Sequence, residues 1–226
     1  TKILGHLALE TKSYEATIRL GQATTTDDAE GETTATTDAS AVSDETIDAG
    51  VAALTGQIDQ VPSAVSAIKV NGRRAYDLVR SGEEVELRSR RVTVSRFDVL
   101  ERVRTGQVID LVVVVDCSTG TYIRALARDL GTALGVGGHL TALRRTRVGP
   151  FGLDVARTLE QLEDHPELSL DLDAAALAAF PRRDIDAEEA EGLRHGQWLK
   201  ARGDTGVVAA VGPDGRVAAL LSESGR

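Results

Sequence analysis

Residues 108–135 place a long apolar run directly before an amphipathic one. The run VIDLVVVVDC ends at Cys117 and is dominated by β-branched valines, which favour extended backbone. Because the valines are consecutive, they predict a strand that is buried on both faces. After the turn STGT, the segment TYIRALARDLGTALG spaces its large apolar residues along one helical face: Ile123, Leu126, Leu130 and Leu134. A buried strand joined by a short turn to an amphipathic helix requires a fold with a helix layered on a sheet.

Further strands and helices precede this pair. In YEATIRL, every second residue from Tyr14 to Leu20 is apolar and the residues between them are polar, which predicts a half-buried strand. The following Thr-, Asp- and Gly-rich stretch is typical of a long hairpin, and Ser43 is placed to cap a helix that runs to about residue 55. The dipeptide Asn71-Gly72 predicts a second hairpin, and VTVSRFDV predicts another strand. Strands and helices that do not alternate regularly indicate an α+β fold with a mixed, largely antiparallel sheet.

The composition changes past Pro150. Ala, Leu, Asp and Glu dominate, and helices are expected near TLEQLEDH and LDAAALAAF. After Pro181 the sequence predicts a short helix followed by the strands GVVAAVG and RVAALLS, joined by a tight turn. We therefore expect a domain over 1–160, a helical connector over 161–180 and a small domain over 181–226.

The charge is distributed unevenly along the chain. The formal net charge is -9, but residues 61–150 carry 15 basic and 9 acidic side chains. Salt screens charges beyond about 8 Å at physiological ionic strength, so a polyanion docked on this central segment would feel its local positive charge. The sequence shows no apolar run long enough to span a membrane and no secretory signal, and Cys117 is the single cysteine. These features predict a cytoplasmic protein that does not contact membranes.

Common enzyme motifs are absent from the sequence. The four histidines are widely separated and have no cysteine partners, so no metal site is expected. GVGGH over 135–139 follows a helix and is interpreted as a helix stop. Two aromatic residues stand out, because Tyr14 begins a strand and Tyr122 begins a helix. Each either covers the core with its ring or forms part of a stacking platform for a nucleic-acid base.

A group of arginines follows the helix. The segment LRRTR holds Arg144, Arg145 and Arg147, and guanidinium groups this close repel one another unless anions balance them. Phosphate binding and pairing with internal carboxylates both remain open from the spacing alone.

Three long motifs, in order, carry a family resemblance. KSYEATIRLGQATTTDDAEG, QVPSAVSAIKVNGRRAYDLVRSGEEVE and DCSTGTYIRALARDLGTALGVGGHLTALRRTRVGPF resemble the TruB-type tRNA pseudouridine synthases, in an actinobacterial style. These isomerases convert uridine 55 of the TΨC arm to pseudouridine after flipping the base out of the RNA. The resemblance runs over residues 1–160, and a weaker one to the family's PUA-like RNA-binding domain follows residue 180. It implies a pseudouridine-synthase sheet flanked by helices with a small C-terminal β unit.

The resemblance also implies roles for individual residues. Tyr14 corresponds to the tyrosine that stacks on the flipped base and is placed for proton transfer at carbon 5. Arg124 is similar to the arginine that pairs with a nucleophilic aspartate, while Tyr122 and Leu143 contact the substrate. Residues 62–91 resemble the insertion that grips RNA. The residues implied in RNA binding are Asp28, Lys69, Arg73, Arg74, Arg144 and Arg145.

The nucleophile itself does not lie in these 226 residues. In the family it belongs to a motif of the type G-H-x-G-T-L-D-P, which is expected upstream of TKILG and before Thr1. The resemblance implies no cofactor and no metal, a tRNA T-arm stem-loop as substrate, and no protein partner. Residues 1–226 alone are expected to be inactive. The alternative from another functional class is a catalytically silent module that binds or folds tRNA.

Overall fold

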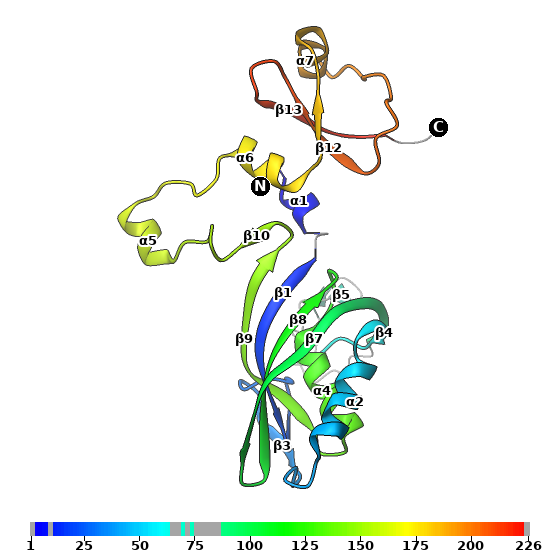
Figure 1. The fold of residues 1–226 in the computed structure, drawn as a ribbon, viewed down its shortest axis with the longest axis vertical. Helices are drawn as coiled ribbons and strands as arrows, with labels where there is room; N and C mark the ends of the chain where they lie inside the picture. The colour runs from blue at the N-terminus through cyan, green and yellow to red at the C-terminus, as the bar shows by residue number, and fades with distance from the viewer. Residues whose placement is uncertain (1–2, 9–10, 64–68, 71–72, 75–86, 224–226) are drawn as a thin grey trace. The chain divides into compact units, whose positions relative to one another are not determined.

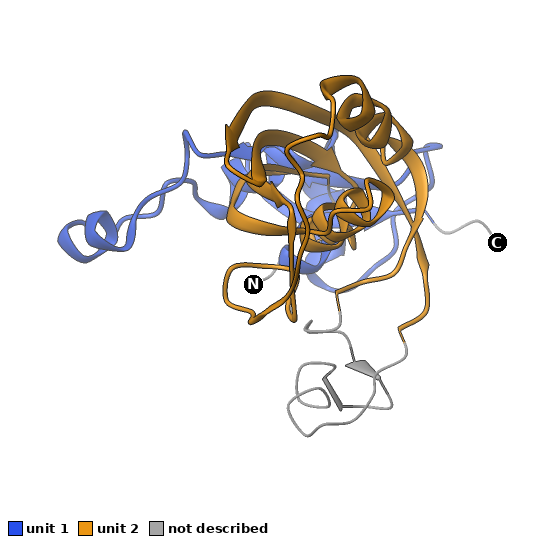
Figure 2. Cartoon of the chain, turned by 90° about the horizontal axis from the view of Figure 1, so that it is seen from below, with its two compact units in different colours: residues 1–7, 149–226 blue, residues 8–148 orange. Residues whose placement is uncertain are grey.

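The computed structural model describes residues 3–8, 11–63, 69–70, 73–74 and 87–223, with backbone only at residues 69–70 and 73–74. The chain divides into two compact units, which Figure 2 colours separately. One unit comprises residues 8–148, and the other comprises residues 1–7 and 149–226. The predicted site residues up to Arg145 all belong to the unit formed by residues 8–148.

An antiparallel sheet forms the frame of residues 8–148 (Figure 1). The strands that residues 8–148 contribute to it are, in spatial order, β9 (Gly138–Val148), β1 (Lys12–Leu20), β8 (Val108–Cys117), β7 (Arg90–Thr105) and β4 (Gly56–Gln60). Neighbouring strands pair antiparallel, with β1 between β8 and β9 along its whole length. The expected α+β fold and the largely antiparallel sheet are confirmed.

Two helices pack on one face of this sheet. They are α2 (Asp44–Ala53), which Ser43 caps as predicted, and α4 (Ile123–Ala133). The predicted stripe on α4 is confirmed, because Ile123, Leu126 and Leu130 are buried and Leu134 packs against the same cluster. The partners of these side chains include Ile18 and Leu20 of β1. The alternating residues of β1 therefore form the floor of the core that α4 covers.

Burial on both faces of the valine-rich strand was a wrong prediction. Along β8 every second residue is buried, including Val113 and Val115, whereas Val112 and Val114 are only partly buried. Alternation arises because successive side chains of a strand point to opposite faces. The described helices α2 and α4 cover only one of these faces, and the other also carries Asp110 and Asp116.

Two short hairpins extend from the main sheet. The Thr-rich stretch forms β2 (Gln22–Thr24) and β3 (Thr33–Thr36), which confirms the first predicted hairpin. The second is also confirmed, since β5 (Lys69–Val70) pairs antiparallel with β6 (Arg73–Arg74) on either side of the Asn-Gly dipeptide.

The unit formed by residues 1–7 and 149–226 is smaller and holds mostly short elements. They are α1 (Leu4–Leu7), β10 (Phe151–Gly152), α5 (Leu159–Asp164), α6 (Leu172–Ala179), β11 (Arg182–Asp184), α7 (Ala187–Arg194), β12 (Val207–Val211) and β13 (Val217–Ser222). The last three strands form a sheet in which β11 runs parallel and β13 antiparallel to β12. This is the expected C-terminal β unit, and no described helix is long and apolar enough to cross a membrane.

A close backbone approach between α4 and β9 generates the first prediction. A Cβ added at Gly131 would lie 2.1 Å from the carbonyl carbon of Gly137 and 2.1 Å from the nitrogen of Gly138. Since backbone cannot move aside as a flexible side chain can, we expect Gly131→Ala to lower the free energy of unfolding by about 1–3 kcal/mol, as overpacked cores do. Urea denaturation measures this difference.

The neighbouring exposed residue provides the control for this prediction. Thr132→Ala changes a side chain on the exposed surface of the same helix, and surface substitutions change stability by about 0.5 kcal/mol or less. Equal denaturation midpoints for Gly131→Ala and Thr132→Ala would contradict the close contact between α4 and β9.

Candidate functional site

Three of the predicted site residues, Tyr14, Tyr122 and Arg124, belong to elements that meet at one end of the main sheet. Because β1 and β8 are antiparallel, the first residues of β1 lie beside the last residues of β8, with Tyr14 opposite Val115. The turn after β8 leads directly into α4, so Tyr122 and Arg124 at the start of the helix belong to the same end. The topology therefore brings together two predicted tyrosines and an arginine that are about 110 residues apart in sequence.

Tyr14 lies on the face of the sheet that the helices cover. It alternates with the buried residues Ala16 and Ile18 and packs, partly buried, at the edge of the same apolar cluster. Burial raises the pKa of its phenol above the ordinary value of 10.0, and a hydrogen bond from Arg145 opposes this shift. The ring is therefore un-ionised near neutral pH and has an arginine beside its hydroxyl.

The strand β9 separates the arginines that the sequence groups together. Arg145 lies opposite Tyr14 and Leu143 lies opposite Ala16, so both share the face of Tyr14. Arg144 lies opposite Glu15 and therefore points to the other face.

Arg147 also belongs to the other face. A β-bulge at residue 146 brings it opposite Ser13, and Arg147 Nη2 lies 3.5 Å from Asp116 Oδ1. The sequence left open whether these arginines bind phosphate or pair with internal carboxylates, and the answer differs from one arginine to another. Internal pairing holds for Arg147, whereas Arg145 faces the site beside the half-exposed Leu143.

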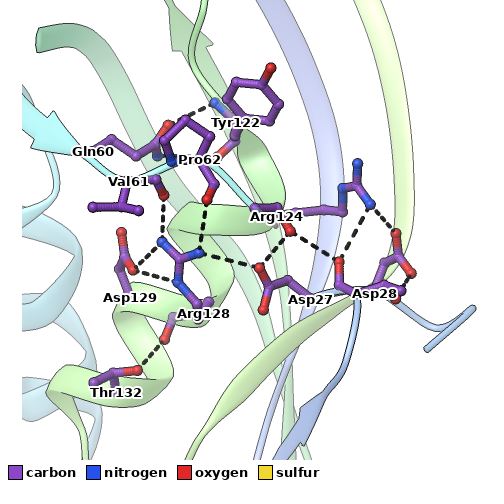
Figure 3. Close-up of polar contacts among 12 residues, drawn as sticks. Asp27, Asp28, Gln60, Val61, Pro62, Tyr122, Arg124, Arg128, Asp129 and Thr132 are labelled. Carbon is purple, nitrogen blue, oxygen red and sulfur yellow. Dashed lines mark hydrogen bonds and ion pairs between the residues drawn. The ribbon is translucent and has the colours of Figure 1, made fainter. Parts of the chain in front are cut away.

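Arg124 is held by a carboxylate from the hairpin that follows β1. Its Nη1 donates to Asp28 Oδ2 at 2.8 Å, and both side chains are about three-quarters buried (Figure 3). Asp28 also accepts hydrogen bonds from the Thr26 hydroxyl and the Glu30 amide through its other oxygen. The structure thus places Asp28, predicted as an RNA-binding residue, against the guanidinium predicted to be catalytic.

A second ion pair lies one helical turn further along α4. Arg128 Nη1 is 3.3 Å from Asp27 Oδ2, and the Ser63 hydroxyl donates to the same oxygen at 2.6 Å. Asp27 adopts a left-handed backbone conformation, with φ of 62°, which few residues other than glycine, asparagine and aspartate adopt readily. This conformation lets two consecutive aspartates pair with two arginines spaced four residues apart on one helix face (Figure 3).

The chain leaving β4 contacts α4 through three consecutive residues. The Gln60 side chain bonds to the backbone of Tyr122, and Arg128 donates to the carbonyl oxygens of Val61 at 2.6 Å and Pro62 at 3.5 Å. Figure 3 shows these contacts beside the two ion pairs. The first two turns of α4 are therefore fixed on one side by the end of β4 and on another by the turn at Asp27.

Sequence reasoning missed Gln60, Asp27 and Arg128. Arg128 could have been found from its spacing, because it lies four residues after Arg124 on a predicted helix. Nothing local marks Gln60, whose role depends on a contact 62 residues away. The predicted RNA contacts of Lys69, Arg73 and Arg74 concern side chains outside the described residues.

The arrangement suits recognition of a planar, polar ring next to anionic groups. A tyrosine ring offers a stacking face, Leu143 offers apolar surface, and arginines at the same end of the sheet offer donors for oxygen acceptors. Among the described residues, no group of three His, Cys, Asp or Glu side chains could hold a metal ion. The described side chains at this end of the sheet supply aromatic, guanidinium and carboxylate groups.

Family models match consecutive parts of the chain. Residues 1–123 match the model described as "TruB family pseudouridylate synthase (N terminal domain)". Residues 124–180 match "tRNA pseudouridylate synthase B C-terminal domain", and residues 180–226 match "tRNA Pseudouridine synthase II, C terminal". The three models together extend over the whole chain.

Similar proteins agree with these models. The chain is 64% identical to a tRNA pseudouridine synthase B of Rhodococcus jostii, over all of this chain and 74% of that protein. It is 63% identical to the protein of the same name from Nocardia farcinica, again over all of this chain and 74% of the relative.

A solved structure resembles the chain in fold. A crystal structure of a Cbf5-Nop10-Gar1 complex contains a chain that matches with a TM-score of 0.69 at 26% identity. The match covers 97% of this chain but 62% of the solved one, so this chain spans less than two thirds of that protein.

The environment of Tyr14 generates the second prediction. A tyrosine whose pKa is raised by folding contributes stability below pH 10, and that contribution is lost as the pH rises through the folded pKa. We expect the difference between the ultraviolet titration curves of the wild-type chain and Tyr14→Phe to give a midpoint above 10.0. The Tyr14→Phe variant should also lose less stability than wild type between pH 9 and 11. A midpoint at or below 10 would show that Arg145 outweighs burial.

Proposed function

The chain belongs to the TruB family of pseudouridylate synthases, and we propose from this premise that it acts on uridine 55 in the T-arm stem-loop of tRNA. As a member of the family it is an isomerase that forms pseudouridine in tRNA. What we propose beyond this is that the modified nucleotide is uridine 55 in the T arm. A tRNA substrate places the reaction in the cytoplasm.

The observation that carries this proposal is the grouping of Tyr14, Leu143 and Arg145 on one sheet face. A uridine flipped from an RNA loop needs a stacking surface, an apolar wall and donors for its neighbouring phosphates. Tyr14 offers the first, the half-exposed Leu143 the second and Arg145 the third. An un-ionised Tyr14 ring also stacks on the base without adding a negative charge beside the phosphates.

Arg124 is assigned a role at the reacting centre through the resemblance. The family nucleophile is an aspartate carboxylate in a motif that residues 1–226 do not contain. A guanidinium beside such a carboxylate keeps it ionised and oriented. In this structure Asp28 Oδ2 accepts a hydrogen bond from Arg124 Nη1 at 2.8 Å, so one side of the guanidinium is already held by a carboxylate.

The second candidate is a catalytically silent module that binds tRNA through the same basic residues. One assay separates the two functions. An unmodified T-arm stem-loop is incubated with the 226-residue chain and, in parallel, with the protein including any segment that precedes Thr1. Pseudouridine at position 55 with the longer protein supports the proposed function. RNA binding without product from either form supports the silent module, and product at another position alone overturns the choice of uridine 55.

Substitution of Arg124 is the third prediction. We expect Arg124→Ala, in the protein including any segment that precedes Thr1, to lower turnover by about 100-fold or more, as loss of an electrostatic group at a reacting centre does. The dissociation constant for the stem-loop should change by less than about threefold, because the lost contact acts on the reaction rather than on phosphates. Single-turnover kinetics and filter binding measure the two quantities.

Arg96→Ala is a matched control for Arg124→Ala. Arg96 is an exposed arginine of β7 that pairs with Asp98 on its own strand, so its loss should leave turnover unchanged. Turnover of Arg124→Ala comparable to wild type would refute the assigned role.

The two faces of β9 give the fourth prediction. If phosphates bind on the face of Tyr14, Arg145→Gln should lower the slope of log affinity against log salt concentration by about 0.7–0.9, the value for one phosphate contact. Arg144→Gln, one residue away on the opposite face, serves as the control and should leave the slope unchanged. Equal changes in this slope for the two substitutions would contradict phosphate binding on the face of Tyr14 alone.

A further inference from the structure

Gln60 bonds to both backbone groups of a single residue at the start of α4. Its Nε2 donates to the Tyr122 carbonyl oxygen at 3.1 Å, and its Oε1 accepts from the Tyr122 amide at 2.8 Å. Gln60 is the last residue of β4 and is only 1% exposed. A buried side-chain amide thus forms the two hydrogen bonds with the Tyr122 backbone that the backbone of a neighbouring strand could otherwise form (Figure 3).

The contact is made where the helix cannot cap itself. Tyr122 is the N-cap residue of α4, and its side chain makes no capping hydrogen bond. Helices usually rely on Ser, Thr, Asp or Asn at this position to fix the first turn. Because Gln60 binds both the amide and the carbonyl oxygen of Tyr122, it restricts rotation of the Tyr122 backbone. It thereby fixes the direction in which the helix begins.

The position of this contact matters for the site. Tyr122 and Arg124 are both predicted site residues, and Arg124 lies in the first turn that Gln60 holds. The next two residues of the chain hold the helix one turn later, through the bonds of Arg128 to Val61 and Pro62. Arg124 therefore lies between two points at which the end of β4 is hydrogen-bonded to α4.

We propose that Gln60 is a positioning residue for the isomerase reaction, which sets the orientation of Tyr122 and Arg124 toward the substrate through the backbone of Tyr122. The proposal rests on the function proposed above. It assigns Gln60 no contact with the RNA, so its loss affects turnover and leaves RNA affinity in place.

Gln60→Glu tests the proposal through pH. An ionised glutamate accepts the Tyr122 amide but cannot donate to the Tyr122 carbonyl, whereas a protonated glutamate has the donor and acceptor of glutamine in the same shape. Burial raises the pKa of such a carboxyl toward the range of the assay. In the protein including any segment that precedes Thr1, we expect kcat of Gln60→Glu to be at least tenfold lower than that of wild type at pH 8.5 and to approach the wild-type value by pH 5.5. KM should change less than threefold.

Two further variants complete this experiment. Gln57→Glu, on the same strand but exposed, should keep a kcat ratio of one at every pH. Gln60→Asn keeps the amide but withdraws it by one methylene, so it should lower kcat without recovery at low pH. This milder variant decides the question if Gln60→Glu does not fold. A folded Gln60→Glu or Gln60→Asn with kcat within twofold of wild type at pH 8.5 would overturn the proposal.

Amide hydrogen exchange gives a readout that does not depend on activity. Peptides covering residues 120–126 should exchange faster in Gln60→Asn than in wild type, while peptides from the last turn of α4 should be unchanged. Unchanged exchange over residues 120–126 would overturn the proposal. A wild-type protein that forms no pseudouridine would instead refute the proposed function, and the exchange data would still decide whether Gln60 holds the helix start.

Discussion

The pairing of β1 with β8 on one side and β9 on the other is the constraint on which the site depends. Every residue of β1 has a partner on both sides, so the face on which each side chain lies is fixed along the whole strand. A shift of one residue in this register would turn Glu15 and Thr17 toward the core and turn Ile18 and Leu20 away from it. The apolar residues therefore set the register, and this register places Tyr14 on the site face beside Arg145.

The two aspartate–arginine pairs contribute to the free energy of folding in a different way from the apolar core. Their side chains are partly buried, and removing a partner from such a pair costs more than the pair itself contributes. Asp27 also has a left-handed backbone, which costs some free energy even in aspartate, although less than in most residues other than glycine. The apolar core under α4 offsets these costs, and the pairs fix where the arginines point. Order at this site is thus supplied by hydrophobic burial elsewhere in the same unit.

Much of the frame could be predicted from the sequence because it follows local periodicity. The alternation from Tyr14 to Leu20, the stripe on α4 and the cap at Ser43 each depend on residues within one element. The valine run was misread for burial because periodicity cannot tell which face a distant helix covers. The contacts that position Arg124 could not be predicted, since Asp28 is 96 residues away in sequence. The roles of Tyr14 and Arg124 came from the family resemblance and stay predictions.

The division of the arginines on β9 follows from the alternation of the strand. In the sequence Arg144 and Arg145 are neighbours and look like one patch, but adjacent strand residues point to opposite faces. A short basic segment of a strand therefore places its arginines on both faces of the sheet. Arg145 lies next to the tyrosine on the helix-covered side, and Arg147 neutralises Asp116 on the other, where Ser13 also bonds that carboxylate. Of these neighbouring arginines, Arg145 therefore lies on the side of Tyr14 and Arg144 on the opposite side, so the basic segment does not form one continuous patch.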